Sequence, residues 1–228
     1  MDWTPKILEG ELVRLEPLAP HHEDGLWQAS RDARTWRWLS IVQPQTPEEM
    51  HDYVEGALAS AGAGLELPFA TIARDEERIV GSTRFLALRP EHRSIEIGWT
   101  WLAPEAWGTG INVEAKLLML EHAFERLACR RVEFKTDARN DRSRGAMEAL
   151  PAQFEGVHRQ QMVVRGGENR DTAWYSILDV EWPEVRANLL RRLGREEELP
   201  DELDRPRRVP EDTVPDVREA VEGDELGR

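Results

Sequence analysis

Residues 95–127 constrain the fold most, because an apolar strand pattern runs through a glycine-bearing turn directly into a long apolar helix pattern. The turn is Trp107-Gly108-Thr109-Gly110. Consecutive backbone N–H groups in such a turn, together with the N-terminus of the following helix, bind a phosphate or pyrophosphate group. Glycine at 108 and 110 lets the backbone approach the anion without a Cβ in the way. The turn has no Gly-Lys-Ser/Thr, and Val113 replaces the third glycine of the dinucleotide fingerprint, so neither common nucleotide motif applies.

The periodicity of the rest of the sequence predicts an α+β domain. We expect strands over 11–18, 67–74, 79–88, 94–102, 132–136, 154–164 and 172–179, and helices over 21–34, 46–58, 111–127, 142–150 and 182–193. Thr46, Pro47 and Glu49 have the spacing of a capping box at the start of the second helix. The helix over 111–127 lies between two expected strands, which predicts one strand–helix–strand unit among otherwise antiparallel strands.

The composition excludes several classes of protein. A single cysteine, Cys129, allows no internal disulfide and no thiolate-rich metal site. A formal net charge of −14 and a pI near 5.0 argue against binding to a phosphate backbone, so we expect no nucleic-acid partner. The start of the sequence lacks the layout of a signal peptide, and no apolar run approaches the length of a membrane span. We therefore expect a cytoplasmic protein that makes no membrane contact.

The charge is unevenly distributed, which indicates two parts. Residues 195–228 contain 13 acidic and 6 basic side chains, no aromatic residue and four prolines. Such a segment cannot bury enough apolar surface to offset the entropy cost of ordering, so we expect a flexible acidic tail. Solvation is its simplest role, and binding to a partner is the alternative. Residues 1–194 form the expected folded domain.

Several spaced motifs resemble the GNAT acetyltransferases. Glu96-Ile-Gly-Trp, Leu102-x-Pro and Trp107-Gly-Thr-Gly-x-Asn-x-Glu-Ala-Lys are similar to the acyl-CoA-binding core of this family. The similarity is closest to the RimJ/RimL branch, which includes ribosomal-protein N-acetyltransferases. Matches at 135–144, 154–159 and 170–176 follow in the same order, so the resemblance covers about 8–190. It implies the GNAT acyl-CoA N-acyltransferase fold, a mixed and mostly antiparallel sheet flanked by helices.

The resemblance also implies transfer of an acetyl group from acetyl-CoA to a primary amine by direct attack, without a metal. The family's pyrophosphate loop corresponds to Trp107, Gly108, Thr109, Gly110, Ile111 and Asn112. The backbone of Thr100, Trp101 and Leu102 would pair with the pantetheine arm, and a main-chain N–H there would stabilise the oxyanion. Asn140 matches the residue that contacts pantetheine, and Ser143 matches the hydroxyl that protonates the departing thiolate.

The reaction also needs a base, since an amine is mostly protonated at neutral pH. Glu96 is the first candidate, because strand alternation places it on the same face as Gly98. A structural ion pair between Glu96 and an arginine is an equally good interpretation. Asp171 and Glu155 are weaker candidates for the base.

Three positions depart from the family pattern. Trp107 stands where many relatives have arginine or glutamine, which removes one charged phosphate contact, and Asn112 replaces a small residue. Pro151 stands where relatives have a glycine that ends a helix. Because glycine can take a positive φ there and proline cannot, we expect this helix to end differently, with a shift of Asn140 and Ser143.

The identity of the acceptor is left open by the sequence. Trp36 and Trp38 follow the first expected helix, where this family shapes its acceptor site, so we expect both to line that site. The acceptor is a small amine, an amino acid or a protein N-terminus, and the chain is a monomer or a homodimer. The alternative function is an acyl-CoA-binding sensor or interaction module that has lost turnover, as Pro151 and the acidic tail suggest. An enzyme would release free CoA in the presence of an acceptor, whereas a sensor would only bind.

Overall fold

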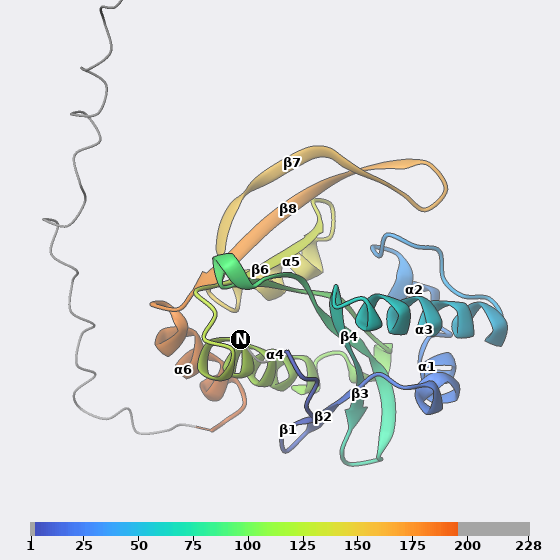
Figure 1. The fold of residues 1–228 in the computed structure, drawn as a ribbon, viewed down its shortest axis with the longest axis horizontal. Helices are drawn as coiled ribbons and strands as arrows, with labels where there is room; N and C mark the ends of the chain where they lie inside the picture. Colours follow the sequence, from blue (N-terminus) through green and yellow to red (C-terminus); the bar gives the residue numbers. More distant parts are fainter. Residues whose placement is uncertain (1–2, 196–228) are drawn as a thin grey trace, which may run out of the picture. The chain divides into compact units, whose positions relative to one another are not determined.

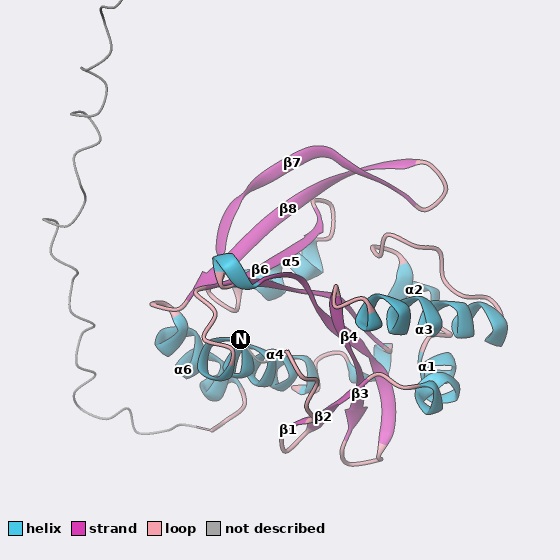
Figure 2. Ribbon diagram, in the orientation of Figure 1, coloured by secondary structure: helices cyan, strands magenta, loops and turns pink. Residues whose placement is uncertain are grey.

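The computed structural model describes residues 3–195, so the expected acidic tail lies outside the described residues except for Arg195. The described chain forms one eight-stranded sheet in the order β1-β2-β3-β4-β5-β6-β8-β7 (Figures 1 and 2). The strands are β1 (Leu8–Glu9), β2 (Val13–Pro17), β3 (Glu66–Ala73), β4 (Arg78–Arg89), β5 (Ser94–Leu102), β6 (Arg131–Asp137), β7 (Gln153–Val164) and β8 (Glu168–Leu178). The α-helices are α1 (Glu23–Ala29), α2 (Ala33–Trp36), α3 (Pro47–Gly62), α4 (Ile111–Glu121), α5 (Asp141–Glu148) and α6 (Trp182–Arg192). The predicted α+β class and all seven predicted strands are confirmed.

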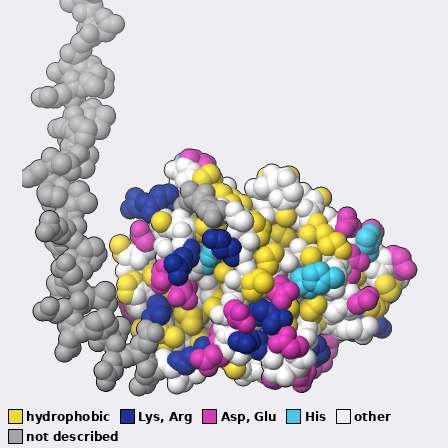
Figure 3. All heavy atoms as spheres, turned by 60° about the horizontal axis from the view of Figure 1, so that its bottom comes forward, with side chains coloured by type: hydrophobic (Ala, Val, Ile, Leu, Met, Phe, Trp, Pro, Cys, Tyr) yellow, Lys and Arg dark blue, Asp and Glu magenta, His cyan; other side chains and the backbone are white. Residues whose placement is uncertain are grey.

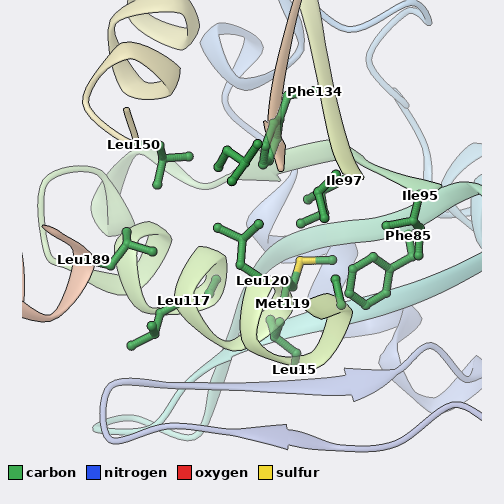
Figure 4. Close-up of a cluster of buried hydrophobic side chains, with 14 of the residues drawn as sticks. Leu15, Phe85, Ile95, Ile97, Leu117, Met119, Leu120, Phe134, Leu150 and Leu189 are labelled. Atoms are coloured by element: carbon green, nitrogen blue, oxygen red, sulfur yellow. The ribbon is translucent and has the colours of Figure 1, made fainter. Parts of the chain in front are cut away.

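Each face of the sheet carries a hydrophobic core. The division is clear on β3, where Phe69 joins the cluster that includes α4 and α6, whereas its neighbour Ala70 joins the cluster that includes α1 and α3. Figure 4 shows the first cluster, in which strand residues pack against Leu117, Met119 and Leu120 of α4. The apolar side chains of the two faces pack into these two cores. The polar side chains of the strands remain available to form the site.

The first expected helix is divided in two. α1 ends at Ala29, and the Ser30 hydroxyl donates to the Trp27 carbonyl at 2.8 Å. Asp32 then caps α2 by accepting from the Arg34 N–H at 2.8 Å. Serine and aspartate compete with the helix for its own backbone groups, and this competition accounts for the break.

The capping box of α3 differs in one detail from the prediction. Thr46 Oγ1 accepts from the Glu49 N–H at 3.2 Å, as predicted. The Glu49 carboxylate returns to the N–H of Gln45 at 2.6 Å rather than to that of Thr46. The motif therefore also fixes the residue that precedes the cap.

Glu114 anchors α4 to the loop that connects β1 to β2. It is fully buried, and its carboxylate accepts hydrogen bonds from the backbone N–H groups of Glu11, Leu12 and Val13, at 3.0, 2.6 and 2.8 Å. Arg195 also donates to this carboxylate. The contact fixes the position of the helix that begins at the glycine turn.

The end of α5 bears on the expectation for Pro151. The Met147 carbonyl accepts from the N–H groups of Leu150, at 3.0 Å, and Ala152, at 3.1 Å, and Pro151 has a φ of +29°. The bond from Ala152 is the long-range bond of a Schellman motif, in which the residue at the position of Pro151 is usually a glycine. Because proline has no N–H, the second bond of that motif is missing, so α5 ends differently from a helix that ends at a glycine, as expected. The cap between Asn140 and Ser143 is nevertheless in place.

Two further features concern the surface. On the face shown in Figure 3, acidic and basic side chains lie side by side. No helix within residues 3–195 is both long enough and apolar enough to cross a membrane.

Candidate active site

β5 and β6 are parallel neighbours that separate after their first three residues. They pair only from Ser94 to Glu96, opposite Arg131 to Glu133. Beyond this point a cleft of about 380 Å³ opens, lined by residues of both strands, of α4 and of α5. In Figure 1 the sheet spreads into two arms, with β6, β8 and β7 in one and β1 to β4 in the other. The edge of β5 that faces the cleft is therefore free to pair with an extended molecule.

A β-bulge redirects the backbone of β5 within the cleft. Ser82 pairs with Trp101 and Arg84 pairs with Gly98, so that two residues of β5 lie opposite Thr83 alone. One of them, Trp99, has a φ of +49°. Bulges bend a strand and leave local backbone groups unpaired, and they are frequent beside active sites.

The glycine turn has the geometry of an anion-binding loop. Gly108 and Gly110 have φ values of +77° and +89°. Within the described residues, the backbone N–H groups of Gly108, Thr109 and Gly110 form no hydrogen bond, and Ile111 begins α4 directly after them. The Asn112 side-chain oxygen is buried without a partner and belongs to a residue that lines the cleft. These free groups fit the pyrophosphate and pantetheine parts of an acyl-CoA.

The side chains of Thr109 and Ile111 stabilise the structure of the turn and of the helix start. The Thr109 hydroxyl donates to the Ala106 carbonyl at 2.8 Å, and the Ile111 side chain is in the core. Both residues can contact an anion only through their backbone.

Trp107 is accompanied by two arginines. Its indole N–H donates to the Leu102 carbonyl at 2.9 Å, which ties the turn to the end of β5. The Arg142 guanidinium carbon lies 3.7 Å from the centre of the Trp107 ring, and that of Arg34 lies 5.6 Å from it. Arg34 is paired with Asp32 at 2.6 Å, so the positive charge that the tryptophan does not supply comes from Arg142 on α5.

Glu96 forms an ion pair in the lining of the cleft. Its carboxylate is 1% exposed and lies 2.9 Å from Lys135 Nζ. A Cβ on Gly98 would lie 2.9 Å from Glu96 Oε1, which confirms that the two residues share a face. Burial raises the pKa of Glu96, and Lys135 opposes this shift only in part. The partner is a lysine rather than the expected arginine, and the carboxylate keeps the raised pKa that suits a general base.

Lys116 is a buried amine in the lining of the cleft. Its Nζ donates to Thr100 Oγ1 at 3.0 Å, and Thr83 Oγ1 lies 2.8 Å from the same oxygen. Burial lowers the pKa of Lys116 to about 7. The Thr100 side chain thus points towards α4 and leaves its backbone to line the cleft.

Asn140 and Ser143 are joined at the start of α5. Asn140 caps the helix by accepting from the Ser143 N–H at 3.2 Å, and its amide donates to Thr136 Oγ1 at 3.2 Å. Among residues 3–195, the Ser143 hydroxyl has no hydrogen bond, and Ser143 lines the cleft. The Ser143 hydroxyl is therefore available to act as an acid. The position of Asn140 is explained equally well by its role as the helix cap and by a contact with pantetheine.

The two candidate acceptor tryptophans lie in different environments. Trp38 lines the cleft. Trp36 is 2% exposed, donates from its indole to the Ser30 carbonyl at 2.8 Å, and packs 5.1 Å from the Trp101 ring in the core beneath α1 and α3. The expectation that Trp36 lines the acceptor site is therefore wrong, since its size is used for packing.

The loop after α2 is tied to the hairpin of β7 and β8 across the cleft. Arg165, in the turn of this hairpin, donates to the Leu39 carbonyl at 2.5 Å from its side chain and to the Ser40 carbonyl at 3.3 Å from its backbone. Leu39, Ser40, Met162 and Arg170 also line the cleft. These elements enclose the end of the cleft opposite the glycine turn.

The basic residues of the cleft, namely Lys116, Lys135, Arg142, Arg170 and Arg192, were missed by the sequence analysis. Lys116 could have been found, because it stands four residues after Asn112 and so shares its helix face. Lys135 and Arg170 could not, since their positions depend on the pairing of β6 with β5 and with β8, respectively.

The fold and the cleft together define an acyl-CoA-dependent N-acyltransferase. The chain belongs to the acetyltransferase (GNAT) domain family, which matches residues 13–153, and this confirms the expected GNAT fold. The structure resembles that described as an acetyltransferase from T. thermophilus, with 40% identity, a TM-score of 0.77, and coverage of 85% of this chain and 100% of that one.

Two further relatives agree. A GCN5-related N-acetyltransferase from Brucella melitensis shares 35% identity and a TM-score of 0.75, over 81% of this chain and 86% of its own. The uncharacterized N-acetyltransferase YoaA of Bacillus subtilis (strain 168) is 24% identical over 172 residues, which cover 75% of this chain and 96% of the relative.

Proposed function

We propose that this protein transfers an acetyl group from acetyl-CoA to the primary amine of a small acceptor. One observation carries the proposal: the free edge of β5, with its bulge at Trp99, ends at a turn whose three successive N–H groups have no partner within residues 3–195. A strand edge for an amide-containing arm beside a turn for a pyrophosphate matches the two halves of a CoA ester.

Acetyl-CoA would supply an activated thioester carbonyl. Gly108, Thr109 and Gly110 would hold the pyrophosphate through their backbone, aided by Arg142, and the backbone of β5 through Leu102 would hold the arm. A backbone N–H at Trp101 or Leu102 would donate to the carbonyl oxygen as it becomes an oxyanion.

Glu96 would take the proton from the acceptor amine, directly or through a water, as the nitrogen bonds to the carbonyl carbon. The carbon–sulfur bond then breaks, and the Ser143 hydroxyl would protonate the departing sulfur. The raised pKa of Glu96 and the unbonded hydroxyl of Ser143 support these roles.

Within the family we propose the RimJ/RimL branch, because the sequence motifs are most similar to those of that branch. The ribosomal L7/L12 α-N-protein acetyltransferase RimL shares the fold with a TM-score of 0.67 at 21% identity. A protein N-terminus is accordingly the alternative acceptor. The alternative of an acyl-CoA-binding sensor rested mainly on an expected distortion at Pro151. The cap between Asn140 and Ser143 is intact despite this proline, which weakens that alternative.

The binding half of the proposal is tested with a matched pair of variants. Gly108 (φ +77°) lines the cleft, whereas Gly64 (φ +72°) follows α3 away from it, and neither Cβ would meet a neighbour within 4 Å. Both Gly108→Ala and Gly64→Ala therefore cause the same backbone strain, on the order of 1 kcal/mol. We expect calorimetry to show at least tenfold weaker acetyl-CoA binding for Gly108→Ala alone. Equal affinities for both variants, or no binding by the wild type, would reject the site.

The transfer half is tested by release of free CoA. A panel of primary amines with acetyl-CoA should give at least one acceptor that accelerates release above the background of hydrolysis. Binding without any such acceptor, including N-terminal peptides, would favour the sensor.

A further inference from the structure

Arg170 is a buried cation in the cleft without a counter-ion of its own. It lies on β8, is 6% exposed and lines the cleft. Within residues 3–195, its guanidinium forms no hydrogen bond and no ion pair, and its Nε is buried without an acceptor. An arginine stays protonated and has five N–H donors, so an unpaired and buried one destabilises the folded chain.

The alternation of β8 shows which face Arg170 occupies. Ala173 and Tyr175 point into the core beneath α4, so Arg170 and Trp174 point to the opposite face. On that face Trp174 lies under Lys135, with 5.2 Å from Nζ to the ring centre, and Lys135 holds Glu96. Arg170 therefore shares the face of the proposed base.

The other charges near Arg170 are already used by one another. Lys135 pairs with Glu96, Arg139 pairs with Asp137, and Arg165 pairs with both Asp137 and Glu168. These side chains and Arg170 make four cations against three carboxylates. Both Asp137 and Glu96 act on Arg170 through their charge, but neither bonds to it. The charge balance of this face therefore favours one more anionic group.

The pyrophosphate does not account for this unbalanced charge. Its proposed turn follows β5, whereas Arg170 lies on β8, and the two strands flank β6 on opposite sides. The turn also has its own cation in Arg142, which stacks on Trp107. The anion that Arg170 lacks must therefore come from the acceptor side.

We propose that Arg170 binds a carboxylate of the acceptor, so that the substrate is a small amine that also carries a carboxylate, as a free amino acid does. The inference rests on the proposed acetyltransferase function. Glu96 would receive the amine and Arg170 the carboxylate, by the bidentate geometry that guanidinium groups favour. The contact of Arg165 with Leu39 narrows the acceptor side, in keeping with a small molecule.

The test compares acids with their amides. The wild type is assayed for CoA release with the common L-amino acids and with the corresponding α-carboxamides, which keep the amine and lose the anion. We expect at least one acid whose kcat/KM exceeds that of its amide by about 10- to 100-fold. Arg170→Met should reduce this ratio to near one, mainly through KM, whereas Arg159→Gln, an equal change of charge on the exposed β7, should leave it unchanged.

A binding measurement keeps the inference testable if turnover is not detected. Thermal melts are run with Nα-acetyl amino acids and with their amides, as product-like probes. At least one acid should raise the Tm of the wild type more than its amide does, and should not raise that of Arg170→Met. In the absence of ligand, Arg170→Met should itself raise the Tm, since it removes an unpaired buried charge.

The outcomes separate the two proposals. Normal acetyl-CoA binding with equal use of acids and amides overturns the carboxylate role and leaves the acetyltransferase. Better use of a peptide with an acidic side chain near its N-terminus than of any free amino acid overturns the small-molecule assignment. If the wild type does not bind acetyl-CoA, the proposed acetyltransferase function is rejected as well.

Discussion

Lys135 holds Glu96 through an ion pair of 2.9 Å inside the cleft, where the carboxylate is almost completely buried. This relationship makes Glu96 both a structural group and the best-placed base. Glu96→Gln should lower kcat by about 10²- to 10⁴-fold, since it keeps the size of the side chain and removes proton acceptance. Because the pKa of Glu96 is raised, the wild-type rate should fall as the pH drops through that raised value, and the variant should lose this dependence. Asp171→Asn is the control, and if it alone removes the acid limb, Asp171 is the base.

Arg142 should bind the pyrophosphate of the cofactor. Its guanidinium is stacked 3.7 Å from the Trp107 ring beside the anion-binding turn. Arg142→Gln should weaken acetyl-CoA binding by about tenfold, as expected for one charge-assisted hydrogen bond. The affinity for S-acetylpantetheine, which lacks the pyrophosphate, should not change. An equal loss for both ligands in calorimetry would contradict this role.

Glu114 should be essential for stability at neutral pH. Burial opposes its ionised form, but Arg195 and three backbone N–H donors outweigh this and lower the pKa of Glu114. Its contribution is therefore present above the unfolded pKa, about 4.3, and is lost as the pH falls through the folded value. Glu114→Ala should cost about 3–5 kcal/mol in urea unfolding at pH 7. Glu11→Gln, on an exposed partner of Arg195, should cost less than about 1 kcal/mol.

Lys116 should make stability depend on pH in the alkaline range. Burial lowers the pKa of Lys116 to about 7, whereas the unfolded chain keeps it near 10.4. Between these values the unfolded state binds more protons, so stability should rise with pH. Lys116→Met should be more stable than the wild type at pH 7, and the difference should shrink towards pH 10. A difference that stays constant across urea melts at pH 7, 8.5 and 10 would show that Lys116 is charged in the folded protein.

Pro151 should be a site where stability can be gained. The ring of proline fixes φ near −65° and leaves no N–H, whereas the helix end at position 151 calls for a positive φ and an N–H donor, which strains the turn. Pro151→Gly should relieve this strain and raise the stability by about 1 kcal/mol, which is about 2–4 °C in Tm for a chain of this size. Pro90→Gly, at a position without a positive φ, should lower the Tm. A fall of Tm in both variants would show that the turn tolerates the proline without strain.

Local patterns were enough to predict the class of fold and the glycine turn before α4. The strand into 102, the glycines at 108 and 110 and the apolar helix after them depend on neighbouring residues only, and all are found in the structure. The prediction for Trp36 was wrong because a tryptophan at this position can serve either of two roles. Trp36 could pack or line the site, and only the packing of α1 and α3 decided between them.

The sequence by itself therefore determined the order of elements, the turn at Gly108 and Gly110 and the family, because these follow from short spacings along the chain. Only the tertiary structure decided which charges meet. The pairing of β5 with β6 brings Lys135 to Glu96, and the pairing of β6 with β8 places Arg170 on the same face without a partner within residues 3–195. Strand register across more than thirty residues is not encoded in any local pattern.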